Sequence, residues 1–312
     1  MKPLPLLLPI LITLAAQAQA PFVNEVSITV NGSRRQIRSN GIPDHPTGAF
    51  PNAHNPNSIR EQDYDFRMTA EPKRRSKPTP YRMQPFGVAV NGVVLDPFAA
   101  EWWHGDSTSG WQYEPQGGAI DLGLDEHNAH VQPNGAYHYH GIPTGLLQRL
   151  SGGEAKMTLL GWAADGFPIY GPLAYEKQND ATSPVRAMKS GYRVKAGARP
   201  ARNSPGGNYD GSFIQDYEWA AGVGDLDENN GREGVTPEFP QGTYYYVLTD
   251  SYPFIPRQFA GNPDSSFERR GPPGGMGPGG GPPGFGPGGP GGRPPPPRGR
   301  RGGPGFPPPP PF

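Results

Sequence analysis

Four of the seven histidines in this chain fall within fourteen residues, at His127, His130, His138 and His140. The last two are separated by one residue in an aromatic stretch that we expect to be a β-strand. Successive side chains of a strand point to opposite faces, so His138 and His140 share a face, with Cα atoms about 6.7 Å apart. Imidazole nitrogen is a preferred ligand of Zn²⁺ and Cu²⁺. The pattern therefore predicts that both rings bind one metal ion, while Tyr137 and Tyr139 pack on the other face.

Further ligands can be proposed from the same region. His130 precedes a short Asn134-Gly135 turn that would return it to His138 and His140, giving a site with three histidines. Asp125, His127 or the distant His45 would supply a fourth ligand. Zn²⁺ and Cu²⁺ both suit imidazole, whereas non-haem iron would need a carboxylate such as Asp125. The alternative is that these histidines are ordinary polar positions on a solvated strand.

Two acidic motifs lie outside the histidine region. Asp165 opens a segment with Gly and Pro at both ends, which indicates a rigid turn. Its carboxylate is a candidate catalytic base or a partner that orients a ligand histidine; the alternative is a turn-forming role. Asp225 and Asp227 resemble an acidic calcium loop, but Asn230 stands where an EF-hand needs Gly. A calcium site there remains open beside the simpler reading of a capped turn.

The elements that must position these residues read mainly as β-strands. Val88 and Val90 precede Asn91-Gly92, a pair that favours a type I′ hairpin turn because both positions accept positive φ. Helix signals are short: one segment starts at Asp96-Pro97 and runs to Trp103, and another spans residues 144–150. We expect a mainly β, loop-rich domain, a β-sandwich or barrel with few short helices.

An internal similarity suggests two related β units. Residues 124–128 and 226–230 both read Leu-Asp-Glu-x-Asn, and each is followed by Gly-x-Tyr-x-Tyr, at 135–139 and 242–246. The alignment places Asn229, Arg232, Tyr245 and Val247 opposite His127, His130, His138 and His140. The shared residues would then be scaffold, and the metal site would belong to one copy.

Both ends of the chain differ from the middle. Residues 1–20 have one Lys, an apolar run and small residues at the end, which is typical of a secretory signal peptide. Residues 263–312 are rich in Gly and Pro and predict a disordered tail, because such a composition has little to bury. The remaining domain, residues 22–262, contains no stretch of about 20 apolar residues that would span a membrane.

Composition limits the partners and the chemistry. The chain has 312 residues, no Cys and a formal net charge of zero. Thiolate ligands, disulfides and Cys nucleophiles are therefore excluded, and nucleic-acid binding is not expected. Four Arg residues in the distal part of the tail favour contact with anionic polymers or polysaccharides of a cell envelope; they are Arg293, Arg298, Arg300 and Arg301. A secreted or periplasmic location is expected from the signal peptide.

Several blocks of the chain resemble the YHYH-domain family of exported proteins. They are Ser39–His45, Tyr137–Pro143, Asp165–Pro172, Leu226–Arg232 and Gly242–Tyr246, and the resemblance covers residues 40 to 261. It implies export and suggests His138, His140, His45, His130 and Asp165 as site residues, but it assigns no biochemical role. We therefore expect an exported metal-binding protein. The alternatives are a metal-dependent extracellular enzyme, hydrolytic or oxidative, and a structural protein of the cell surface.

Overall fold

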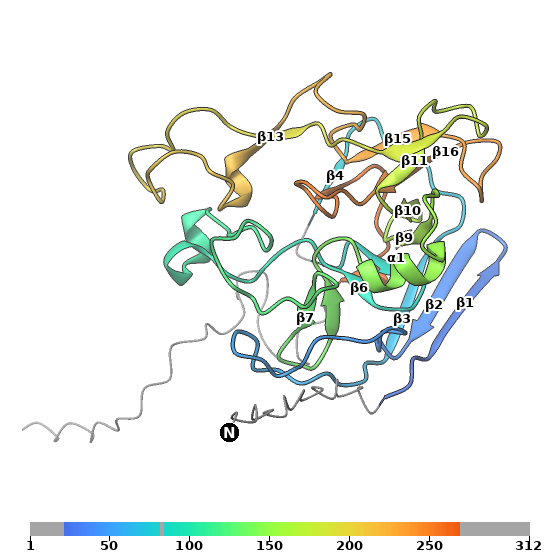
Figure 1. Ribbon diagram of the computed structural model, residues 1–312, viewed down its shortest axis with the longest axis horizontal. Helices are drawn as coiled ribbons and strands as arrows, with labels where there is room; N and C mark the ends of the chain where they lie inside the picture. Colours follow the sequence, from blue (N-terminus) through green and yellow to red (C-terminus); the bar gives the residue numbers. More distant parts are fainter. Residues whose placement is uncertain (1–21, 82–83, 269–312) are drawn as a thin grey trace, which may run out of the picture.

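The computed structural model describes residues 22–81 and 84–268, and their fold is mainly β and rich in loops (Figure 1). The predicted signal peptide and the tail from residue 269 onward lie outside the described residues. Ordered structure continues past residue 262, because Ser265–Phe267 forms a 3₁₀ turn and Phe267 packs on Phe66 with ring centroids 4.5 Å apart. No helix in the described part of the chain has the length and apolar character needed to cross a bilayer.

The largest sheet has eight strands in the order β15-β16-β10-β9-β5-β6-β8-β7. From one edge to the other these are Gly231–Gly234, Thr243–Val247, Pro168–Tyr170, Leu159–Ala163, Gly87–Ala89, Val94–Leu95, Tyr137–Tyr139 and Ala129–Val131.

The two halves of this sheet have the same topology. In one half, the β5–β6 hairpin is followed by β8, parallel to β6, and by β7, antiparallel to β8. In the other half, the β9–β10 hairpin is followed by β16, parallel to β10, and by β15, antiparallel to β16. Because β5 and β9 meet antiparallel at the centre, a half-turn about an axis between them exchanges the halves. This arrangement confirms the two related β units expected from the sequence.

A second sheet covers the face of the large sheet that carries the tyrosines. It contains β1 (Val26–Asn31), β2 (Arg34–Ser39) and β3 (Tyr64–Thr69) in that order. Ile37 and Met68 from this sheet are fully buried in one cluster with Tyr139 and Tyr246. The fold is therefore a sandwich whose core contains the tyrosine face of both halves, and the opposite face of β8 is left for other contacts.

The hairpin around Asn91-Gly92 forms, but with a different turn from the one expected. Only Gly92 has a positive φ, at 81°, and Ala89 N–H bonds to Val93 O across a three-residue loop. This is a type I turn followed by a left-handed residue rather than a type I′ turn. A side chain at position 92 would collide with Ser39, so the approach of β2 accounts for the glycine.

Helices are scarce in the described residues, as expected. The predicted helix at 144–150 is confirmed as α1 (Thr144–Ser151), which ends at Gly152 in the left-handed conformation. The segment from Asp96 to Trp103 forms no α-helix; a 3₁₀ turn begins only at Trp103 (Trp103–Gly105). A second 3₁₀ turn spans Ser107–Ser109, and a third spans Ile214–Asp216.

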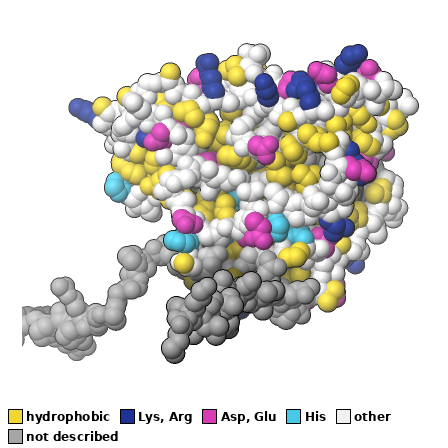
Figure 2. Space-filling view, viewed as in Figure 1, with side chains coloured by type: hydrophobic (Ala, Val, Ile, Leu, Met, Phe, Trp, Pro, Cys, Tyr) yellow, Lys and Arg dark blue, Asp and Glu magenta, His cyan; other side chains and the backbone are white. Residues whose placement is uncertain are grey.

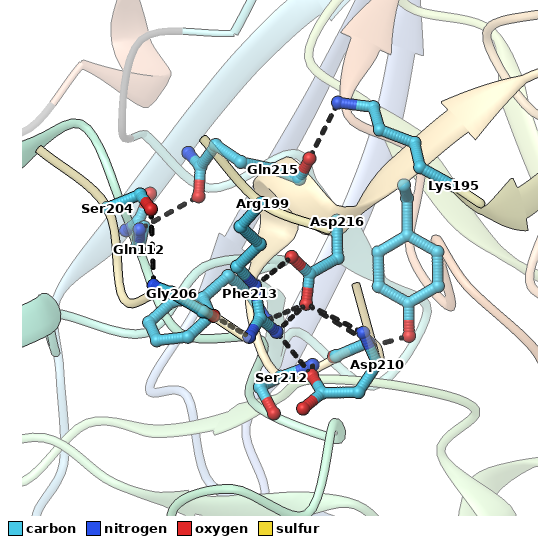
Figure 3. Close-up of polar contacts among 12 residues, drawn as sticks. Gln112, Lys195, Arg199, Ser204, Gly206, Asp210, Ser212, Phe213, Gln215 and Asp216 are labelled. Carbon is cyan, nitrogen blue, oxygen red and sulfur yellow. Dashed lines mark hydrogen bonds and ion pairs between the residues drawn. The ribbon is translucent and has the colours of Figure 1, made fainter. Parts of the chain in front are cut away.

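Three two-stranded ribbons complete the fold. They pair β11 with β12, β13 with β14, and β17 with β4, at Leu173–Tyr175, Val185–Ala187, Tyr192–Val194, Tyr217–Trp219, Gln258–Phe259 and Thr79–Pro80. Near β13, a buried Arg199 guanidinium lies between Asp210 and Asp216 and holds the long loops together (Figure 3). Asp216 also accepts main-chain hydrogen bonds from Gly211 and Phe213. This network fixes the loops at the periphery of the large sheet.

Candidate metal centre

The β7–β8 hairpin at the edge of the large sheet brings three histidines together. His130 lies directly opposite His138 in the antiparallel register. His140 follows β8, two residues after His138, and so extends the same face. The connecting turn is closed by a hydrogen bond from Gly135 N–H to Gln132 O, at 2.8 Å, and Gly135 adopts a φ of 91°. The predicted return of His130 to the other two histidines is thus confirmed.

The three rings converge on one point. Their centroids lie 4.6 to 4.8 Å apart, and one nitrogen from each ring lies within 4.8 Å of the others. The Nε2 atoms of His130 and His140 are 3.1 Å apart. Two ligands of a tetrahedral ion with metal–nitrogen bonds of about 2.0–2.1 Å are separated by about 3.3 Å. The geometry therefore fits a single small metal ion.

Main-chain carbonyls orient two of the rings. His130 Nδ1 lies 2.8 Å from Leu122 O, and His138 Nδ1 lies 3.1 Å from Ala136 O. A carbonyl can only accept a hydrogen bond, so each Nδ1 carries the proton and each Nε2 presents its lone pair. Histidine ligands of metals are typically held by this type of contact.

His140 is positioned through its own main chain. Its N–H donates to Asn128 O at 2.7 Å, and its carbonyl accepts from Gln116 Nε2 at 2.8 Å. Asn128 has a φ of 57°, a conformation that Asn tolerates better than most residues. Neither Gln116 nor Leu122 carries a sequence signal that would have linked it to the histidines.

The three histidines are largely removed from solvent. His138 and His140 are each 1% exposed, and His130 is partly exposed. Burial also lowers the pKa of His130, although the Leu122 carbonyl and the charge of Asp125 act in the opposite direction. A neutral imidazole is the form that binds a metal. In the described part of the chain, these three residues are the one group of three or more His, Asp and Glu side chains with converging ligand atoms, and it contains no carboxylate.

The three residues proposed as a fourth ligand lie elsewhere. His45 Nε2 lies 2.7 Å from the Tyr139 hydroxyl, and the His45 and His127 rings are in edge contact at 4.4 Å. Asp125 accepts a hydrogen bond from the Tyr137 hydroxyl at 2.7 Å. Because these tyrosines alternate with His138 and His140 along β8, their partners are on the opposite face. The sequence cannot reveal this separation, since it depends on how the loop at His45 crosses the sheet.

Asp165, the candidate catalytic base, is not brought to the cluster either. It is buried in the β9–β10 turn, where its Oδ2 accepts hydrogen bonds from the Tyr246 hydroxyl at 2.6 Å and from Gly261 N–H at 2.8 Å. Burial raises its pKa to about 6. Its position matches that of Asn91 in the β5–β6 turn, which contacts the Tyr139 hydroxyl at 2.9 Å. The surroundings of Asp165 thus favour the turn-forming role.

The carboxylates proposed for calcium have other partners. Asp225 forms a two-pronged ion pair with Arg186, at 2.7 and 2.8 Å. Asp227 accepts hydrogen bonds from the Tyr244 hydroxyl and from the N–H groups of Asn229 and Gly231. These contacts match a capped turn, and nothing in the geometry favours a calcium ion.

The second copy of the hairpin shows what the fold needs without histidine. Asp125 and Asp227 make the same contacts. Each carboxylate accepts hydrogen bonds from a tyrosine hydroxyl and from the N–H groups two and four residues later in the chain. The three histidine positions are taken there by Arg232, Tyr245 and Val247, and Arg232 Nε donates to the Tyr245 hydroxyl at 2.6 Å. The hairpin therefore forms with or without the histidines.

A cavity of about 250 Å³ lies near the residues that hold the main chain of His140. Gln116 and Asn128, the two residues that fix that main chain, are part of its lining. Further lining comes from the start of α1 and from the loop containing Asp250 and Phe254. The three histidines are not part of its lining.

Comparison with protein families gives one match. The family model described as YHYH protein matches residues 65–261, which include the whole β7–β8 hairpin and its second copy. No curated protein and no solved structure matches the chain.

Proposed function

The chain belongs to the YHYH protein family, and we propose that it is an exported metal-binding protein that holds one Zn²⁺ or Cu²⁺ ion between His130, His138 and His140. Its task would be to handle or sense that ion outside the cytoplasm. Export, to the periplasm or the medium, is proposed from the signal-like residues 1–20.

One observation carries this proposal: three imidazoles converge, and carbonyl groups direct the Nε2 atoms of two of them inward. His130 Nε2 faces His140 Nε2 at 3.1 Å. At this distance the two nitrogens share one proton in a hydrogen bond. A metal ion in its place would accept a lone pair from each nitrogen.

The second hairpin argues against a purely structural role. It keeps the Asp cap, the tyrosines and the antiparallel register, but has Arg232, Tyr245 and Val247 where the first copy has histidines. Folding of this hairpin therefore does not require three histidines. Their presence in one copy is better explained by a ligand.

Metal handling is favoured over catalysis by the surroundings of the cluster. In many hydrolytic metal sites, a nearby carboxylate or histidine takes a proton from metal-bound water. Among the described residues, the cluster contains no carboxylate, and Asp165 bonds to Tyr246 instead. Three imidazoles fit both Zn²⁺ and Cu²⁺, so the choice between them is left to experiment.

The proposal is tested by thermal unfolding of untagged, metal-free protein with and without added Zn²⁺ or Cu²⁺. At a free metal concentration about 100-fold above Kd, binding to the folded state adds about 2.7 kcal/mol. For a domain of this size the melting temperature should rise by roughly 5–10 °C. His130→Gln should remove the rise, whereas the exposed His104→Gln should keep it. An equal response of both variants would contradict the assignment.

A further inference from the structure

The route by which an ion reaches the buried cluster is set by His130. His138 and His140 are each 1% exposed, and His130 is the member that is partly exposed. An ion from solvent therefore meets the His130 side of the cluster first. On that side His130 is contacted by Asn55, from the loop of residues 52–57, and by Leu122, from residues 121–123.

These two segments are packed tightly against each other. Asn52 Nδ2 donates to Gly123 O at 3.0 Å, and Gly123 has a φ of 65°. A Cβ atom at position 123 would lie 2.4 Å from Asn52 Oδ1 and 2.8 Å from Asn55 N. The segments therefore form one fixed cover over His130.

Each segment exposes one group that can bind a cation. His54 Nε2 and Asp121 Oδ2 lie 3.3 Å apart, and their side chains are 56% and 63% exposed. A nitrogen and an oxygen at about this separation can bind the same ion. Both residues are adjacent in sequence to a residue that contacts His130. His54 precedes Asn55, whose Nδ2 lies 3.3 Å from His130 Nδ1, and Asp121 precedes Leu122, whose carbonyl oxygen lies 2.8 Å from the same atom. On the face drawn in Figure 2, histidine side chains reach the surface beside acidic ones.

The residue next to His54 in the chain, Asn55, carries a buried oxygen without a partner in the described part of the chain. Asn55 is 4% exposed, and its Nδ2 donates to Val131 O at 3.0 Å. Its Oδ1 has no hydrogen-bond partner among the described residues. A buried acceptor without a partner is destabilising, and a bound water or ion is a common explanation.

We propose that His54 and Asp121 form a loading site that captures the metal ion at the surface and passes it by Asn55 Oδ1 to the three histidines. The inference rests on the proposed function. Its physical basis is the placement of acidic groups: the cluster contains no carboxylate, whereas Asp121 presents one at the surface beside His54. The loading site takes the same divalent ion as the cluster, and it holds that ion only during entry and exit.

A loading site affects rates and leaves the equilibrium unchanged. Removing a group along the route raises the barrier for entry and for exit equally, so both rate constants fall by one factor. We expect His54→Gln and Asp121→Asn each to slow association roughly three- to tenfold. Dissociation should slow by the same factor, and Kd should stay within about twofold of wild type.

The experiment is stopped-flow mixing of untagged, metal-free protein with Zn²⁺ or Cu²⁺, with a chromophoric chelator reporting free metal. Dissociation is followed by adding excess chelator to the loaded protein. His104→Gln and Asp63→Asn serve as matched controls, because both change exposed residues outside the two covering segments. These controls should retain the wild-type rates.

The outcomes separate the two proposals. Wild-type rates in both loading-site variants, with normal metal binding, would overturn the loading site and leave the cluster assignment intact. Faster dissociation with a weaker Kd would also overturn it, because His54 or Asp121 would then be a permanent ligand. Failure of the wild-type protein to bind either metal would instead refute the proposed function itself.

Discussion

Asp165 and Asn91 take equivalent places in the two halves of the large sheet, but only Asp165 can carry a charge. Both side chains accept a hydrogen bond from the N–H two residues ahead, at 3.4 and 3.3 Å, and both contact a buried tyrosine hydroxyl. Burial raises the pKa of Asp165 from 3.8 to about 6. The charged form is therefore tolerated in the folded protein at a cost in stability.

This cost predicts how stability depends on pH. Between about pH 4 and pH 6 the folded state binds the Asp165 proton more tightly than the unfolded state, so the free energy of unfolding falls as pH rises. Two pKa units correspond to about 3 kcal/mol. Asp165→Asn removes this titration. The free energy of unfolding of the variant minus that of wild type should therefore increase by about 2–3 kcal/mol when the pH is raised from 4 to 7.5.

Urea unfolding of the metal-free proteins at both pH values measures this difference. Other titrating groups are shared by the two proteins and cancel. If the two stability profiles ran parallel, Asp165 would have an ordinary pKa and the explanation from burial would fail.

The convergence of the three histidines could be predicted from the sequence, but the absence of a fourth ligand from among His45, His127 and Asp125 could not. Alternation along a strand is enough to place His138 and His140 on one face, and the Asn134-Gly135 turn indicates the return of His130. The positions of His45 and Asp125 depend instead on side-chain contacts with Tyr139 and Tyr137. Those contacts join distant segments, and a single sequence gives no distance between them.

At the scale of elements, two equivalent turns of the large sheet, at Gly92 and Gly166, lie against the smaller sheet. Gly92 and Gly166 both have a positive φ, and β2 and β3 pass close to them. A Cβ atom at position 92 would lie 2.2 Å from Ser39 Oγ, and one at position 166 would lie 2.2 Å from Thr69 O. The glycines thus let the smaller sheet approach the tyrosine face.

Gly92→Ala tests this account, with Gly32→Ala as its matched control. Gly32 also has a positive φ, at 57°, but nothing lies within 4 Å of an added Cβ. Its substitution should cost about 1 kcal/mol from backbone strain alone. Gly92→Ala adds a steric conflict with Ser39, and we expect a loss of about 2–4 kcal/mol in the free energy of unfolding.

Denaturant unfolding at neutral pH provides both values. Equal losses for the two variants would mean that close packing against β2 is not the reason for glycine at position 92. The Asn91-Gly92 pair illustrates the same limit of sequence reasoning. It indicated a hairpin correctly, but the turn type depends on the neighbouring sheet.

At the scale of the whole molecule, a duplicated β unit carries the histidines in one copy. The sequence predicted the duplication from Leu-Asp-Glu-x-Asn and the tyrosine repeat, because these residues form the cap and the core contacts of both hairpins. It could not predict that the copies lie at opposite edges of one sheet. That arrangement requires the central pairing of β5 with β9, two strands that are distant in sequence.

The duplication also sets the stoichiometry that the proposed function requires. If the histidine hairpin binds metal and its second copy does not, each chain should hold one ion. The direct measurement is elemental analysis of untagged protein beside a His138→Ala/His140→Ala variant, with circular dichroism to show that both are folded. We predict close to one equivalent of Zn or Cu in the wild type and almost none in the variant. Substoichiometric metal in both proteins, after each has been incubated with Zn²⁺ or Cu²⁺, would contradict the account.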